Sequence, residues 1–486
     1  MPRSRSHKRG RTRLATAAVA AAGTLAAAAL SAAVGTLVTG TAATGTPNSG
    51  IAAAAASALP VVRIAPNVIR VPGAPRQSPL TTAQCESGLG IACYQPSQLR
   101  TAYHLPALYS EGIKGQGQTI AIVDSFGSPT IKSDLKAFDK QFNIAAPPSF
   151  TIIAPAGKIP AFNPGNSDML NWASETTLDV EYAHALAPAA KILLVETPVS
   201  ETEGVTGFPQ IVKAEKYVLA HYKVGVISQS FSATEETFKN YAQLAPLRAA
   251  YTEAYNHHVT VLAASGDTGA TDYTSNVIDL YTRRVTSWPD SDPLVTAVGG
   301  TQLKQSGSGY TSVAWNDTYD QAWEAYSTGS ATSLNATASG GGTSEFFARP
   351  AWQNGVKAIT GAHRGVPDIS MSAACDGSVE VYSSFQGAGW SLICGTSEAT
   401  PEFAAIVVLA DQVAGHPLGL INPKLYSLLA EHAPGLVDVT SGNNTVSFEQ
   451  GAGLQTVTGY PARKGYDLVT GVGTVNAAQL VPELAS

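Results

Sequence analysis

The sequence predicts an α/β fold with a mostly parallel central sheet that is covered by helices on both faces. Short apolar runs alternate with stretches of helical spacing, and continuous apolar strands are typical of a parallel sheet buried on both sides. The strand-like runs are Thr119–Asp124, Lys191–Glu196, Val224–Ser230 and Val259–Ala264. The helix-like stretches lie near residues 130–142, 172–187, 209–222 and 244–257. Functional groups of such a sheet collect at the carboxyl ends of its strands.

The composition describes a large globular protein with an acidic body. The chain has 486 residues, of which 44% are hydrophobic and 14% are charged, so it is not disordered overall. Residues 1–85 hold nine Lys and Arg residues and no acidic residue, which leaves 21 basic and 36 acidic residues in the remainder, a net charge of −15. Because phosphate recognition needs positive charge, we expect no nucleic-acid partner.

Residues 1–39 are predicted to be a signal peptide. Six basic residues within positions 1–14 precede an uncharged, Ala-rich run at 15–39, which is the order of a secretion signal. The alternative is an uncleaved membrane anchor, but Ala is only weakly apolar for a spanning helix. We therefore expect a secreted, extracellular protein with no membrane partner after signal removal.

Residues 40–84 are predicted to be a linker or a short pro-segment. They are rich in Ala, Pro, Ser and Thr, and no helical or strand period is sustained. The folded domain is predicted to occupy residues 85–486.

The four cysteines fall into two close pairs, Cys85 with Cys93 and Cys375 with Cys394. Three connectivities are possible, and export favours disulfides. We expect the two local pairs to be bonded, and the alternative is four free buried thiols.

A short turn before an apolar helical run presents Ser397 as a candidate nucleophile. The segment Gly395–Pro401 (GTSEATP) is made mostly of small residues, and a helix N-terminus supplies N–H groups for a developing oxyanion. The alternative is an ordinary N-cap serine. A nucleophilic serine needs a base, but no histidine lies in an H-G-T-H context, and His184 comes closest. Either the serine is inert or its base is not a histidine.

Two acids near residue 177 are candidates for that base. Ser174 is predicted to be an N-cap, and Glu175 and Asp179 are four residues apart, which places both carboxylates on one helix face. Like charges repel there, so the two acids would share a proton more readily than either would bind one alone. The alternative is that the helix dipole favours acids in a first turn.

Two further acids lie at predicted strand ends. Asp267 follows the run Val259–Ala264 and opens an Asp-Thr-Gly triplet, as in an aspartic protease, but no second triplet of that kind occurs. Asp124, in the segment IVDSFG, resembles the start of a subtilisin catalytic strand, but the histidine motif that should follow is missing. The alternative for both is an ordinary loop acid.

Taken together, residues from about Tyr94 to Asn476 resemble the sedolisin family of serine-carboxyl peptidases, which have a subtilisin-like fold. The matching segments occur in the family's order: TIAIVDSFG, ETTLDVEYAHALAPAAKI, VISQSFS, AASGDTGA, WPDSDPLVTAVGGT, SGGGTSEFFARPAWQ, RGVPDISMSA, GWSLICGTSEATP and GYDLVTGVGTVNA. The resemblance implies Ser397 as the nucleophile, Glu175 as the general base, Asp179 as the acid that orients Glu175, and Asp267 in the oxyanion hole.

The resemblance also implies a Ca²⁺ site near the C-terminus. The implied ligands are two carboxylates and three backbone carbonyls, contributed by Asp438, Val439, Arg463, Gly465 and Asp467. Arg463 stands where the family has glycine, and a backbone carbonyl is all that is needed there. An all-oxygen shell suits Ca²⁺, and the alternative is ordinary turn acids.

The sequence departs from the family at its N-terminal side. The family usually carries a large folded prodomain, and residues 40–84 are too few for one. The resemblance therefore leaves open whether self-inhibition and assisted folding by a prodomain apply to this chain.

These expectations combine into a secreted, acid-acting endopeptidase that hydrolyses protein or peptide substrates as a monomer. At about pH 4 a carboxyl group is still half protonated, whereas a histidine is fully charged and cannot act as a base. The alternative is a non-catalytic secreted protein that binds peptides on the same fold.

Overall fold

The computed structural model describes residues 69–70, 73–385, 387 and 389–486. The predicted signal peptide and residues 40–68 of the predicted linker lie outside the described residues. Among the residues that are described, no helix is both long enough and apolar enough to cross a membrane.

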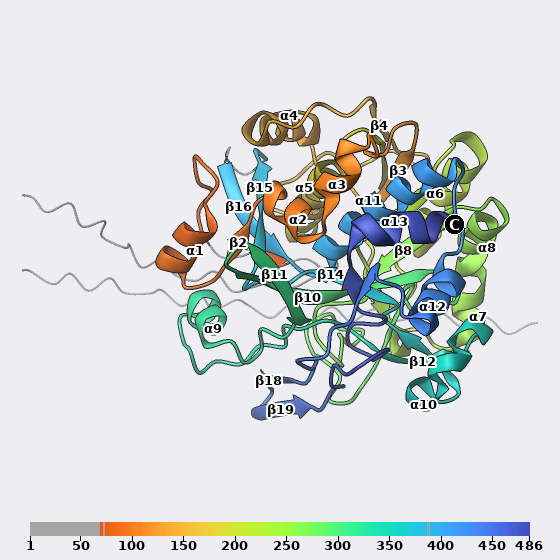
Figure 1. Ribbon diagram of the computed structural model, residues 1–486. Coiled ribbons are helices and arrows are strands. Elements are labelled where there is room, and N and C mark those ends of the chain that lie inside the picture. Colours follow the sequence, from red (N-terminus) through yellow and green to blue (C-terminus); the bar gives the residue numbers. More distant parts are fainter. Residues whose placement is uncertain (1–68, 71–72, 386, 388) are drawn as a thin grey trace, which may run out of the picture. The chain divides into compact units, whose positions relative to one another are not determined.

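A largely parallel sheet of eight strands forms the centre of the described fold (Figure 1). Its strand order is β11-β10-β8-β6-β3-β5-β4, with β14 beside β10, and among these pairs only β10 and β11 are antiparallel. The strands are β3 (Thr119–Ser125), β4 (Phe150–Ile153), β5 (Lys191–Thr197), β6 (Val226–Gln229), β8 (Thr260–Ala264), β10 (Thr296–Ser306), β11 (Gly309–Ala314) and β14 (Ile369–Ser372). The predicted α/β class is confirmed, and the four predicted strands coincide with β3, β5, β6 and β8.

Helices cover both faces of this sheet, and strand β3 shows why. Ile120 and Ile122 point into one hydrophobic cluster, whereas Ala121 and Val123 point into another, because successive side chains of a strand alternate between faces. The first cluster contains residues of α5 (Ser167–Leu186), α11 (Thr396–Ala414) and α13 (Ala477–Ala485). The second contains residues of α6 (Phe208–His221) and α8 (Ala249–Asn256).

Helix α11 is the central helix of the first layer. It contacts α5, α13 and five strands of the main sheet, and its residues 396–411 are all buried. Most of these residues are apolar, and a helix that is buried on every side belongs in the interior of a large domain.

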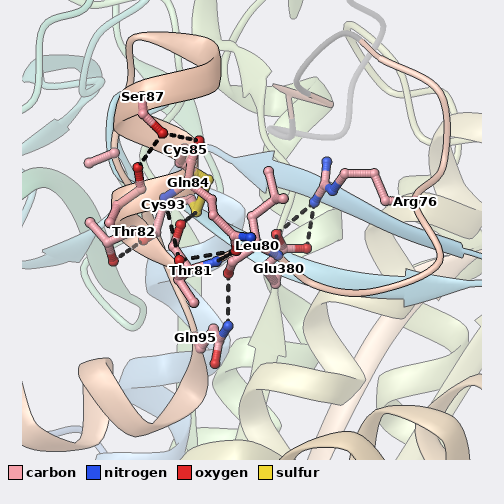
Figure 2. The surroundings of a disulfide bond; sticks show 12 residues. Arg76, Leu80, Thr81, Thr82, Gln84, Cys85, Ser87, Cys93, Gln95 and Glu380 are labelled. Carbon is pink, nitrogen blue, oxygen red and sulfur yellow. Dashed lines mark hydrogen bonds and ion pairs between the residues drawn. A yellow bond between two sulfur atoms is a disulfide. The ribbon is translucent and has the colours of Figure 1, made fainter. Parts of the chain in front are cut away.

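A second sheet, of order β1-β16-β15-β2, anchors the start of the described chain. Its strands are β1 (Ile69–Arg70), β2 (Cys93–Tyr94), β15 (Ser378–Ser383) and β16 (Gly389–Cys394). Figure 2 shows the surroundings of the Cys85–Cys93 disulfide, where Arg76 forms an ion pair with the buried Glu380 at 2.6 Å and the N–H of Leu80 donates to the same carboxylate at 2.7 Å.

The end of the predicted linker is therefore part of the fold. Strand β1 pairs with β16, so residue 69 lies opposite Cys394. Local composition could not reveal this attachment, because its partners lie about 300 residues away in the sequence. The predicted disulfides Cys85–Cys93 and Cys375–Cys394 are both confirmed.

The remaining elements are shorter and lie mostly in connections. The helices are α1 (Thr82–Leu89), α2 (Pro96–Ala102), α3 (Leu105–Ser110), α4 (Ile131–Phe142), α7 (Tyr241–Leu244), α9 (Gln321–Thr328), α10 (Lys357–Thr360) and α12 (Asn422–Glu431). The strands are β7 (Ala233–Thr234), β9 (Ser287–Trp288), β12 (Gly342–Ala348), β13 (His363–Val366), β17 (Leu436–Val437), β18 (Val446–Gln450), β19 (Gly453–Val457) and β20 (Thr474–Val475).

Candidate active site

Three parallel strands deliver polar residues to one edge of the main sheet. Asp124 lies at the end of β3, Ser230 directly follows β6, and Asp267 follows β8. Strands β6 and β8 are neighbours, and β6 also pairs with β3. Because the carboxyl ends of parallel strands share an edge, these three side chains are brought to the same end of the sheet.

Ser397 lies in the first turn of α11. The chain leaves β16 at Cys394, and Gly395 then adopts a φ of 123°, a conformation that suits glycine and turns the chain into the helix. Gly395 occupies the N-cap position and no side chain caps this helix, so the alternative of an N-cap serine is wrong for Ser397. The Ser397 side chain is buried, and its hydroxyl donates to the carbonyl oxygen of Ser230 at 3.2 Å.

Helix α5 carries Glu175 and Asp179 in its middle, not in its first turn. The helix begins at Ser167, and its N-cap is Asn166, whose side chain accepts from the N–H of Met169 at 3.2 Å. The predicted N-cap at Ser174 is therefore wrong, and the hydroxyl of Ser174 donates instead to the carbonyl of Leu170. Since the helix dipole acts only at the ends, it does not explain these two acids.

The carboxyl groups of Glu175, Asp179 and Asp124 form a buried acidic group. All three residues are fully buried. Burial raises the pKa of Glu175 well above its usual range, the charges of Asp179 and Asp124 raise it further, and the neighbouring hydroxyl of Ser397 lowers it. Burial and the charge of Asp124 likewise raise the pKa of Asp179. Burial also raises the pKa of Asp124 to about 7.

Ser230 connects the nucleophile candidate to Asp179, and sequence reasoning did not single it out. Its hydroxyl donates to Asp179 Oδ1 at 2.9 Å, while its carbonyl accepts from Ser397. The sequence compares Asp124 with a subtilisin catalytic strand or an ordinary loop acid and gives it no role in the site, whereas in the structure its charge acts on Glu175 and Asp179. The position of both residues at the ends of predicted strands is the signal that would have found them.

Asp267 is fixed against the first residue of α11. Both the backbone N–H and the hydroxyl of Thr396 donate to Asp267 Oδ1 at 2.8 Å. The Thr396 hydroxyl in turn accepts from the N–H of Gly266 at 3.2 Å. These contacts hold the loop after β8 against the residue next to Ser397. A proton on the Asp267 carboxyl would sit on Oδ2, because Oδ1 already accepts two hydrogen bonds.

Two further acids follow Ser397 on α11 and were also missed. Glu398 and Glu402 are fully buried, one helical turn apart. Burial raises the pKa of Glu398 well above its usual range, and the charge of Asp267 raises it further. Burial and the charge of Glu398 do the same for Glu402.

Histidine takes no part in these contacts. Among the described residues, no hydrogen bond joins a histidine to Ser397. His184 is buried on α5, but its ring approaches Asp139 of α4 at 3.2 Å and the carbonyl of Ala145 at 3.0 Å. His257 ends α8 as its C-cap residue.

The segments that carry the expected Ca²⁺ ligands meet in space. The N–H of Gly465 donates to the Asp438 carboxylate at 3.1 and 3.2 Å. Asp467 is buried and accepts from three backbone N–H groups of its own turn, including that of Arg463 at 2.9 Å. Asp438 and Asp467 thus supply two carboxylates on segments that meet, and carboxylate oxygen is a hard ligand of the kind that suits Ca²⁺.

The fold and the sequence both match known peptidases. The subtilase family model matches residues 156–453. Kumamolisin from Bacillus sp. (strain MN-32) is 31% identical over 80% of this chain and 63% of its own length. Sedolisin from Pseudomonas sp. (strain 101) is 33% identical over 46% of this chain and 34% of its own length. The chain thus spans less than two thirds of either relative.

A solved structure of Pseudomonas sedolisin, described as a serine-carboxyl proteinase complexed with pseudo-iodotyrostatin, superposes with a TM-score of 0.66 at 25% identity. It covers 81% of this chain and 98% of its own. The chain therefore belongs to the subtilase family. Within it the relatives are sedolisins, which confirms the resemblance and the subtilisin-like fold that the sequence motifs predicted.

Proposed function

We propose that this protein is a secreted serine-carboxyl peptidase that hydrolyses peptide bonds in acid through an acyl-enzyme on Ser397. The observation that carries the proposal is the position of the Ser397 hydroxyl beside Glu175, a buried carboxyl whose helix presents Asp179 one turn later. A serine beside a base that is itself oriented by a third group is the arrangement of an activated nucleophile.

The chemistry follows from these neighbours. The Ser397 hydroxyl turns from the Ser230 carbonyl to Glu175, which takes its proton as Oγ forms a bond to the substrate carbonyl carbon. The electron pair of the C=O bond moves to the oxygen, and a protonated Asp267 donates a hydrogen bond to that oxyanion. Glu175 then gives its proton to the leaving nitrogen as the C–N bond breaks. In deacylation water replaces the amine, and Glu175 takes and returns a proton again.

The acid requirement has two parts. Asp267 donates a hydrogen bond only while it is protonated, and a carboxyl group with an ordinary pKa is protonated only near or below pH 4. Glu175 must be ionised to accept a proton. Its raised pKa makes it a stronger base once ionised, and Asp179 shares the proton that it receives. Attack needs Asp267 protonated and Glu175 ionised at the same moment. Because burial raises the pKa of Glu175, this combination is a minor one among the protonation states present in acid.

We further propose that the enzyme is an endopeptidase. The neighbouring solved structure is described as a proteinase, whereas tripeptidyl-peptidase 1 from Homo sapiens is 28% identical over 64% of this chain and 51% of its own length. Products separate the two modes, because a tripeptidyl peptidase releases three-residue fragments from one end and an endopeptidase releases fragments of mixed length.

Secretion and Ca²⁺ binding are part of the same proposal. The basic and then apolar start of the sequence and the two disulfides support export. Ca²⁺ held by Asp438, Asp467 and the carbonyls of Val439, Arg463 and Gly465 would supply a structural cross-link between the two C-terminal segments, and it takes no part in peptide hydrolysis.

A peptidase assay tests the proposal directly. Purified protein is incubated with denatured polypeptide between about pH 3 and pH 7, and fragments are identified by mass spectrometry. We expect cleavage that is maximal in acid. Tight binding of polypeptide with no fragments at any pH would favour the alternative, a non-catalytic peptide-binding protein.

A further inference from the structure

A pocket lies among α9, the loop at residues 272–281 and the β18–β19 hairpin, and it contains none of the four candidate catalytic residues. Its volume is about 160 Å³. Leu280, Ala336 and Phe448 give it buried apolar walls, and Ile278 lies at its rim with 79% of its surface exposed. A cavity of about 150 Å³ with similar walls accommodates one benzene ring, so this pocket has the size of a single aromatic side chain.

Two residues that line this pocket carry buried hydrogen-bond donors that have no partner in the described part of the chain. Trp323 and Ser327 are 1% and 4% exposed, and both line it. Within the described part of the chain, neither the indole Nε1 of Trp323 nor the hydroxyl of Ser327 has a hydrogen-bond partner. A buried donor without a partner carries a substantial free-energy cost, which a ligand with an acceptor oxygen would remove.

The local fold places these donors side by side. Asp320 caps the start of α9 by accepting from the N–H groups of Ala322 and Trp323, and Gly329 ends the helix in a left-handed conformation. Residues four apart on a helix share one face, so Trp323 and Ser327 point in the same direction. One phenolic oxygen, which has two lone pairs, can accept from both groups.

Hydrogen bonds between neighbouring segments fix the walls of the pocket that lie opposite Trp323 and Ser327. Asn335 donates to Glu324 through both its backbone and its side chain, at 3.0 and 3.1 Å. Gln450 accepts from the N–H of Leu280 at 2.7 Å and donates to its carbonyl at 3.1 Å. The loop before Ala336 is thereby tied to α9, and the hairpin is tied to the loop at 272–281.

The charge of the pocket excludes an anionic ligand. Glu449 is the one charged residue among the described residues that line it. A carboxylate or phosphate would meet a like charge and no cation, so the acceptor must be neutral. An aromatic ring that carries a neutral oxygen satisfies the volume, the apolar walls and the two donors together.

The pocket wall leads directly to the candidate active site. The N–H of Ala338 donates to the carbonyl of Asp267 at 2.9 Å, and its carbonyl accepts from Gly269 at 2.9 Å. Ala336 is two residues earlier, which is about 7 Å of extended backbone. The wall of the pocket is thus joined to the loop that carries Asp267, and a substrate long enough to extend from Ser397 past this loop could contact both. The segment of this chain outside the structure cannot fill it with such a ring, because residues 1–68 contain no Tyr, Phe or Trp.

We propose that this pocket binds a tyrosine side chain of a polypeptide substrate, with Trp323 and Ser327 as hydrogen-bond donors to the phenolic oxygen. The inference rests on the proposed peptidase function, because the polypeptide that supplies the tyrosine is the substrate. It adds a contact outside the reacting peptide bond that favours substrates with a tyrosine at a fixed distance from the cleaved bond.

The first experiment measures binding of p-cresol, the side chain of tyrosine, to the full-length Ser397→Ala protein by calorimetry, with toluene as the matched probe without an acceptor. We expect p-cresol to bind more tightly than toluene. Trp323→Phe and Ser327→Ala should each weaken the affinity for p-cresol by about fivefold, the effect expected for loss of one hydrogen bond. The affinity for toluene should not change. Trp352→Phe and Ser330→Ala, outside the pocket, are the matched controls. Melting curves verify folding, and each variant tests the inference independently of the other.

The second experiment measures the dissociation constant of the same proteins for an unfolded polypeptide with tyrosines and for its copy with every Tyr changed to Phe. We expect Trp323→Phe and Ser327→Ala to weaken binding of the tyrosine-containing polypeptide and to leave binding of its Phe copy unchanged. Absence of p-cresol binding would overturn the inference. The donors of Trp323 and Ser327 would then be taken to bond to water. Binding of p-cresol with no effect on the polypeptide would overturn the substrate assignment in favour of a free phenolic ligand. Both binding experiments use the Ser397→Ala protein and do not depend on peptide hydrolysis. A failure of the proposed peptidase activity would therefore be seen only in the activity assay with native Ser397.

Discussion

The hydroxyl of Ser397 donates to the carbonyl of Ser230 at 3.2 Å, while the neighbouring Glu175 carboxyl is buried and, among the described residues, has no hydrogen bond of ordinary length. In this contact the Ser397 hydroxyl is bonded to Ser230, while Glu175, the proposed base, is its neighbour. A rotation of the Ser397 side chain about one bond would move its hydroxyl from the neutral carbonyl of Ser230 to the carboxylate of Glu175. An ionised carboxylate is the stronger hydrogen-bond acceptor. The proposed proton transfer therefore needs a side-chain rotation and no movement of the backbone.

Replacing Ser397 by Ala should abolish peptide hydrolysis and leave the fold intact. The change removes one hydroxyl, which donates to the carbonyl of Ser230, and loss of a nucleophile typically lowers kcat by a factor on the order of 10⁶. The measurement is kcat on denatured polypeptide, together with a melting curve. Near-normal activity of the variant would exclude the serine mechanism.

Glu175→Gln should be nearly as damaging as loss of Ser397, because an amide cannot accept the proton. Asp179→Asn should cost less, since this residue orients its neighbour and does not transfer the proton to substrate. The kcat of both variants is compared with that of His184→Gln, the control for a histidine base. Full activity of Glu175→Gln combined with loss on changing His184 would restore a mechanism of the subtilisin kind.

Changes at Asp267 should separate its hydrogen bond from its titration. Asp267→Ala removes the donor and should lower kcat by about 10²–10³ at every pH. Asp267→Asn keeps a donor that does not titrate, so more activity should remain and the alkaline limb should move upward unless Glu175 and Asp179 set that limb. The measurement is kcat against pH for both variants and the wild type. An Ala variant with wild-type kcat between about pH 3 and pH 6 would leave Asp267 as a turn residue.

The fold itself should be more stable in acid than at neutral pH. Burial raises the pKa of Glu398 and Glu402 above the usual value of about 4.3 that they have in the unfolded chain. The folded state therefore binds more protons, so this stability is complete below about pH 4 and is lost as the pH rises through the folded-state pKa.

Melting temperatures between about pH 4 and pH 8 measure this dependence. Glu398→Gln keeps the shape of the side chain and removes its charge, so its melting temperature should fall less with pH than that of the wild type. Glu86→Gln, at an exposed position, is the control. A melting temperature that rises from acid to neutral pH would contradict the assignment of buried neutral carboxyls.

Chelation should lower the melting temperature if Ca²⁺ binds at the C-terminal segments. A site occupied at a hundredfold excess over its Kd adds roughly 2.7 kcal/mol to the free energy of unfolding. Asp438→Asn should mimic chelation, because Asp438 is exposed and its carboxylate contacts only the N–H of Gly465. Asp467 is a poorer probe, because its carboxylate accepts backbone N–H groups of its own turn and loss of these would destabilise the turn without any ion. An unchanged melting temperature in chelator, together with no calcium detected by elemental analysis, would contradict the proposed Ca²⁺ site.

The sequence alone determined the elements and part of the site. Apolar runs located β3, β5, β6 and β8, because a strand buried on both faces must be apolar throughout. Spacing placed Glu175 and Asp179 on one helix face, and this holds wherever the helix begins. The motif order identified the family. These features depend on residues close together in the chain, so local patterns are enough to predict them.

Only the tertiary structure decided which distant residues meet. Asp124 joins Glu175 and Asp179, Ser230 contacts both Asp179 and Ser397, and β1 pairs with β16, although at least 50 residues separate the partners in every case. Burial also turned ordinary acids into groups with raised pKa, as at Glu398, and enclosed the donors of Trp323 and Ser327 in a pocket. The physical reason is that hydrophobic patterns specify each element and the face it buries, whereas contacts between elements depend on strand order and crossing, which no local pattern encodes.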